Sequence, residues 1–158
     1  MEDQHLLREH LLELLEGRSA HIDLETAIRG FPINLINERL DDRQHSPWEL
    51  LEHTRVALWD IVEFCRDPKH KSPDFPDGYW ALGNANIIQW QKTADAISEL
   101  MGAMRAMVAD TRNDLLAPIP HGDGQTLLRE ALLVADHNSY HLGQLLQLKK
   151  TLEARGTT

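Results

Sequence analysis

Two histidines in the last third of the chain have the spacing of a metal-binding pair. His137 and His141 stand four residues apart in a segment that we expect to be helical. Their imidazoles then lie about 40° apart around the helix axis and one turn apart along it, so both can bind one ion. With nine histidines among 158 residues, chance supplies about half of one such pair. The spacing alone is therefore a weak indicator.

The surroundings of the pair strengthen the prediction of a metal site. His137 and His141 share a helix side with Val134 and Leu145, which should face inward, and an inward imidazole needs a partner. His53 lies in the middle of another amphipathic helix, from which it can reach a shared site between helices. Three neutral imidazoles suit zinc, nickel, iron or copper and leave coordination positions open. We predict a divalent metal ion on these three histidines.

The elements that must position these histidines are all expected to be helical. Apolar residues recur every three or four positions, and the sequence Ser46-Pro47-Trp48-Glu49 is a good helix start with a capping box. The predicted helices cover 3–16, 46–65, 86–110 and 126–154, with a short helix expected near 23–28. Long connections join them. We predict one domain over residues 1–158, an all-α four-helix bundle with long crossover connections.

Composition excludes several classes of partner. The formal net charge of −9 repels nucleic acid and anionic lipid surfaces, and no apolar run is long enough to span a bilayer. Because the first residues lack the features of a secretion signal, we expect a cytoplasmic protein. The single cysteine, Cys65, cannot form an internal disulfide and is expected to be a packed thiol rather than a nucleophile.

Three segments together resemble a known family. The sequence resembles the DinB-like superfamily, which includes YfiT-like and bacillithiol-transferase-like proteins, along nearly the whole chain and in the same order. The segments are Ser46-Pro47-Trp48-Glu49-Leu50-Leu51-Glu52-His53, Phe75-Pro76-Asp77-Gly78-Tyr79-Trp80 and Ala135-Asp136-His137-Asn138-Ser139-Tyr140-His141-Leu142-Gly143-Gln144.

This resemblance implies a four-helix bundle, often a homodimer, in which one histidine of the second helix and a His-x-x-x-His pair of the fourth bind the metal. Those positions are His53, His137 and His141 here. It also implies a metal-dependent enzyme that uses a low-molecular-weight thiol, such as bacillithiol or mycothiol, for S-transfer or isomerisation of a small-molecule substrate. The alternative is a non-catalytic metal-binding or dimeric stress-associated binding protein. The family name does not imply DNA binding.

Other residues near the predicted site have two interpretations each. Asp60 and Glu130, two turns from His53 and His137, either orient a ligand and move a proton or are ordinary solvated or paired carboxylates. The aromatic residues Phe75, Tyr79 and Trp80 form either a lid or a cap on the end of the bundle. We expect the six remaining histidines to be solvated.

Overall fold

Helices, and no strands, make up the regular secondary structure of the described residues. The structure, a computed structural model, describes residues 2–17, 20–81 and 83–156, and these residues contain no β-strand. The all-α prediction is confirmed. The α-helices are α1 (Glu2–Leu15), α2 (Leu24–Arg29), α3 (Pro47–Arg66), α4 (Ile87–Ala109) and α5 (Leu127–Gly156), with 3-10 turns η1 (Ile33–Leu35) and η2 (Asp77–Tyr79).

Side-chain caps determine where two of the long helices begin. At the start of α3, the Ser46 hydroxyl accepts from the Glu49 amide at 3.2 Å, and the Glu49 carboxylate accepts from the Ser46 amide at 2.8 Å. This is the capping box that the sequence predicts. Asn86 and Gln89 form the same reciprocal pair at the start of α4. Both helices that flank the loop 67–86 therefore have fixed N-termini.

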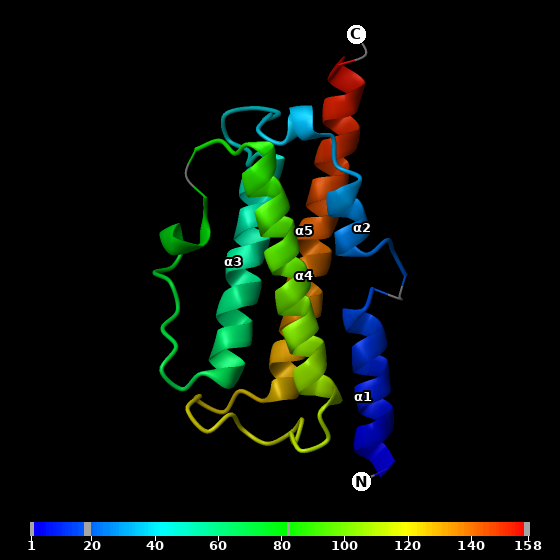
Figure 1. The fold of residues 1–158 in the computed structure, drawn as a ribbon, viewed down its shortest axis with the longest axis vertical. Helices are drawn as coiled ribbons and strands as arrows, with labels where there is room; N and C mark the ends of the chain where they lie inside the picture. The colour runs from blue at the N-terminus through cyan, green and yellow to red at the C-terminus, as the bar shows by residue number, and fades with distance from the viewer. Residues whose placement is uncertain (1, 18–19, 82, 157–158) are drawn as a thin grey trace.

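Helices α3, α4 and α5 pack together, and α1 and α2 both contact α4 and α5. In Figure 1, the short helix α2 follows α1 along the same side of this group. Helices α1 and α2 thus together cover one side of this three-helix group. The buried apolar cluster joins all three central helices, with Leu51, Leu58 and Val62 from α3, Ile97 and Met104 from α4, and Ala131 and Val134 from α5.

Within the described ranges, no helix combines the length and the apolar character that a membrane span requires.

Replacing Ser46 by Ala tests the cap of α3. We expect a loss of about 1 kcal/mol in the free energy of unfolding, because the Glu49 amide loses its acceptor. Urea denaturation of the variant measures it. Ser98→Ala in the middle of α4 is the matched control, since the same change there favours the helix. Equal stability of Ser46→Ala and the unchanged protein would contradict this role.

Candidate metal centre

The structure brings the three predicted histidines together. His53 comes from α3, and His137 and His141 come from α5. One ring nitrogen from each lies within 4.8 Å of the corresponding nitrogens of the other two. The Nε2 atoms of His53 and His137 are 3.2 Å apart, and the His141 ring centroid lies 4.6 Å from that of His53 and 4.4 Å from that of His137. The cluster therefore spans the interface between α3 and α5.

Hydrogen bonds at Nδ1 orient two of the three rings. His53 donates from Nδ1 to the backbone carbonyl of Tyr79 at 3.1 Å, and His141 donates from Nδ1 to Gln144 Oε1 at 2.7 Å. Because both oxygens can only accept, the proton of each neutral ring is held on Nδ1. The Nε2 atoms of His53 and His141 are then acceptors that could bind a metal ion, as in many metal sites whose ligands are oriented by outer partners. His53 Nε2 also lies within hydrogen-bond distance of His137 Nε2.

The separation of one pair of ring nitrogens fits a tetrahedral zinc ion. Two nitrogens bound to one zinc at about 2.0–2.1 Å in a tetrahedral site lie about 3.3 Å apart, and the observed separation of His53 Nε2 and His137 Nε2 is 3.2 Å. The ligand set carries no charge of its own. A divalent ion on it would keep its full positive charge and have room for an anionic fourth ligand.

Burial keeps the three imidazoles neutral. It lowers the pKa of His137 to about 4, with further lowering by the neighbouring His141 and His53. Burial is also the main cause that lowers the pKa values of His53 and His141, although the Tyr79 carbonyl and Gln144 act in the opposite direction. At neutral pH all three rings are therefore in the neutral form, with one nitrogen lone pair available, that metal binding requires.

An aromatic stack covers the outer face of His53. The Trp80 ring lies parallel to His53 with centroids 4.0 Å apart, and His45 stacks on the other face of Trp80 at 3.7 Å. Tyr140 contacts His141 edge to face at 4.9 Å. Sequence reasoning missed His45, which it assigned to solvent, because a loop histidine has no periodicity that would place it. Its ring is one stacking layer away from a predicted ligand.

A groove of about 580 Å³ adjoins the centre. The loop before α3 contributes Arg43 and His45 to its lining, and α5 contributes Tyr140, Gly143 and Gln144. Since Tyr140 and Gln144 also contact His141, one wall of the groove is directly behind a predicted ligand. None of the three histidines lines the groove itself, which lies on the Nδ1 side of His141.

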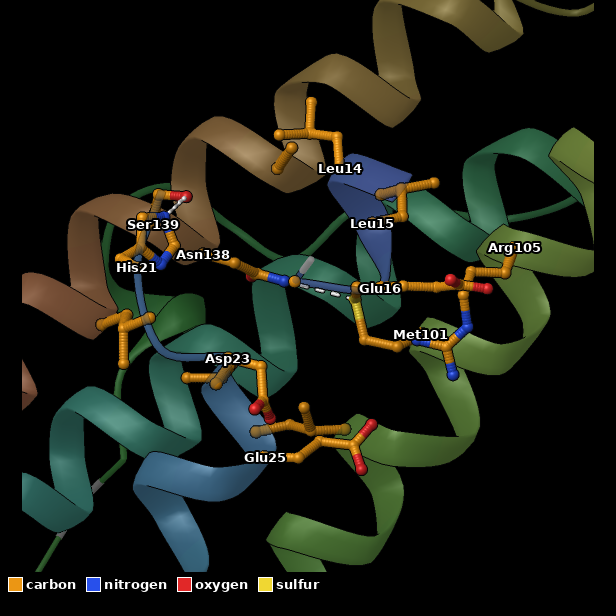
Figure 2. Close-up of a pocket in the computed structure, with 15 residues that line it drawn as sticks. Leu14, Leu15, Glu16, His21, Asp23, Glu25, Met101, Arg105, Asn138 and Ser139 are labelled. Carbon is orange, nitrogen blue, oxygen red and sulfur yellow. Dashed lines mark hydrogen bonds between the residues drawn. The ribbon is translucent and has the colours of Figure 1, made fainter. Parts of the chain in front are cut away.

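A second pocket lies on a different side of α5 and contains none of the three histidines. Figure 2 shows it between α1, α2, α4 and α5, with the Asn138 amide donating to the Met101 sulfur at 3.3 Å. The Asn138 Oδ1 atom is buried and accepts no hydrogen bond from the described residues. This pocket is separate from the metal centre.

The two carboxylates named from the sequence are largely buried and paired. Asp60 Oδ1 binds His70 Nε2 at 2.7 Å, and Asp60 Oδ2 accepts from the Tyr79 hydroxyl at 2.6 Å. The side chain of His70 is only 7% exposed, so the expectation of a solvated His70 is wrong. Glu130 is 2% exposed and pairs with Arg129 at 2.5 Å.

The residues of the predicted lid have different surroundings. Phe75 is 88% exposed, Trp80 stacks on His53, and the Tyr79 hydroxyl is held by Asp60. Burial and the Asp60 carboxylate raise the pKa of Tyr79 to about 12, so it stays protonated. Movement of these residues as a lid stays a prediction.

The fold and the site together define the class of protein: an all-helical chain with a cluster of histidines between two of its helices. A family model described as the DinB superfamily matches residues 8–145, and the chain belongs to this superfamily. No curated protein and no solved structure matches the chain.

Single replacements test the ligand set. We expect His53→Ala, His137→Ala and His141→Ala each to remove most of the bound first-row metal, because each leaves only two imidazoles. Elemental analysis of protein purified without a histidine tag measures the metal. His10→Ala, at an exposed position on α1, is the control and should keep the metal content unchanged. Loss of metal in the control alone, or in none of the variants, would contradict the site.

The lowered pKa of His137 predicts how stability depends on pH in chelator-treated protein. The unfolded imidazole, with an ordinary pKa of 6.5, takes up a proton as pH falls, whereas the folded one does so only near its pKa of about 4. Because the unfolded state binds more protons in this range, stability should fall from pH 6.5 to pH 4.

Urea denaturation at a series of pH values measures this loss. His137→Gln should lose less stability than the unchanged protein over the same range, because its side chain does not titrate there. His10→Gln should behave like the unchanged protein. Equal pH dependence in all three would show that the His137 pKa is not depressed.

Proposed function

We propose that this chain is a divalent-metal-dependent enzyme that activates a low-molecular-weight thiol for transfer to a small electrophile. The observation that carries the proposal is the convergence of three neutral imidazoles, without a carboxylate among them, between α3 and α5. Such a centre has both the open coordination position and the positive charge that a thiolate needs. Membership of the DinB superfamily supports the metal site.

The residues of the chain have distinct roles in this proposal. His53, His137 and His141 hold the ion, which when bound lowers the pKa of a thiol that coordinates it. Trp80 covers one face of His53 and limits the approach of water from that side. Arg43 and Tyr140 line the groove in which the second substrate would bind. The protein itself orients the ligand histidines and the substrates and excludes water.

The transfer of the thiol sulfur to the electrophile needs no oxidant or reductant. The thiol sulfur forms a bond to the electrophilic carbon, and the bond from that carbon to its leaving group breaks with its electron pair. The thiol proton leaves to solvent. The chain's own cysteine is unsuited to this step, because burial and the Glu130 carboxylate raise the pKa of Cys65 to about 12.

A rate measurement tests the proposal. Protein loaded with zinc, nickel or iron is mixed with a small thiol and a chromogenic aryl halide, and product is followed by absorbance. We expect a rate above background that disappears with chelator and falls at least about 100-fold in His137→Ala, since the loss of a direct ligand should cost no less than the loss of an outer partner. His10→Ala should retain the rate.

The opposite result favours the alternative function. If metal-loaded protein gives no rate above background with cysteine, glutathione, bacillithiol or mycothiol, the transferase proposal is wrong. A metal-bound protein without activity would instead be a non-catalytic binding protein. In that case His137→Ala should strongly lower the melting temperature, because the ion would contribute to folding. The homodimer and the cytoplasmic location stay predictions.

A further inference from the structure

One carboxylate holds the loop between α3 and α4 at two points. Asp60 uses Oδ1 for His70 Nε2 at 2.7 Å and Oδ2 for the Tyr79 hydroxyl at 2.6 Å. His70 and Tyr79 lie toward opposite ends of the loop that joins the two helices. The His70 ring also contacts Trp59 edge to face at 4.9 Å. These contacts are largely shielded from water, since the side chains of His70 and Asp60 are 7% and 15% exposed.

Tyr79 connects this carboxylate to the metal centre. Its hydroxyl contacts Asp60, while its backbone carbonyl accepts from His53 Nδ1 at 3.1 Å. Asp60 and His53 are seven residues apart on α3, which is two turns and about 10 Å along one helix face. Tyr79 spans that distance, with its side chain at one end and its backbone at the other. The position of the carbonyl therefore depends on where the hydroxyl is held.

We propose that Asp60 is a positioning residue of the metal centre, which clamps His70 and Tyr79 so that the Tyr79 carbonyl holds the His53 proton on Nδ1. The Nε2 lone pair of His53 then faces the ion. The metal part of this inference rests on the proposed function, whereas the orientation of His53 does not. Asp60 acts through Tyr79 and makes no contact with the ion or a substrate.

Other contacts also hold the segment that contains this carbonyl. The Trp80 ring lies between His53 and His45 and packs against apolar residues of α3 and α5, and the Tyr79 hydroxyl has a second partner in Ser72. Between His70 and Trp80, the loop has one short 3-10 turn, η2, and Phe75 at its tip is 88% exposed. Stacking of Trp80 on His53 fixes the plane of the imidazole, but a flipped ring in the same plane would stack equally well. The hydrogen bond at Nδ1 is what distinguishes the two ring nitrogens.

Two variants that disrupt the contact between Asp60 and Tyr79 test the proposal. Tyr79→Phe removes the hydroxyl and keeps the carbonyl, and Asp60→Ala removes both acceptor oxygens. We expect each to weaken zinc affinity by about 10–100-fold, the usual effect of losing an outer partner of a metal ligand. Competition with a chromophoric chelator measures the affinity. The absorption spectrum of the cobalt-loaded protein should also change, because the geometry at His53 changes.

Tyr140→Phe is the matched control. It removes a hydroxyl from a tyrosine that contacts the ligand His141 through its ring and is 64% exposed. Zinc affinity in this variant should stay within about twofold, as for ordinary surface changes. Clamp variants that melt at a lower temperature but bind zinc with unchanged affinity would overturn the proposal, because Asp60 would then have only a structural role.

A measurement without metal separates this proposal from the proposed function. Long-range proton–nitrogen NMR spectra, assigned with a His53→Gln variant, report which nitrogen of His53 carries the proton. We expect Nδ1–H in the unchanged protein and a mixture of both tautomers in Asp60→Ala. If the unchanged protein binds no metal, the proposed function fails, but the tautomer of His53 still tests the role of Asp60. An unchanged Nδ1–H population in Asp60→Ala would overturn that role.

Discussion

The metal centre depends on the packing of α3 against α5, because no single helix contains all three histidines. His53 Nε2 and His137 Nε2 lie 3.2 Å apart across this interface. A sliding of one helix past the other by a full turn, about 5.4 Å, would move these two nitrogens too far apart for one ion to be shared. The register is fixed by close-packed apolar residues of the same interface. These include Leu58 and Val62 on α3 and Ala131 and Val134 on α5, all at most 1% exposed.

Partial burial of the histidines reconciles two requirements of the centre. A ligand imidazole must be unprotonated, and burial achieves this by penalising the charged form, most strongly at His137. A centre that binds a second molecule must also be reachable. Here His141 is buried, while its neighbours Tyr140 and Gln144 are exposed and line the groove. The same helix turn thus faces the ion on one side and solvent on the other.

Local sequence signals predicted the helices and the pair His137 and His141 because they are properties of single elements. The capping box at Ser46 and Glu49 and the four-residue spacing of His137 and His141 need no tertiary information. That His53 joins them follows from the inward faces of two helices. The clamp at Asp60 could not be predicted in the same way. Its partners His70 and Tyr79 lie in a loop without periodicity, and only the folded chain brings them to α3.

The state of Cys65 limits where a thiolate at this centre could originate. Its pKa is raised to about 12, mainly by burial, so almost none of it is ionised at neutral pH. Reactive cysteines have the opposite surroundings, with positive charge and partial exposure. A thiolate in the proposed reaction therefore has to come from a separate molecule. Arg43, which lines the groove on the Nδ1 side of His141, offers such a molecule a positive charge on a chain of net negative charge.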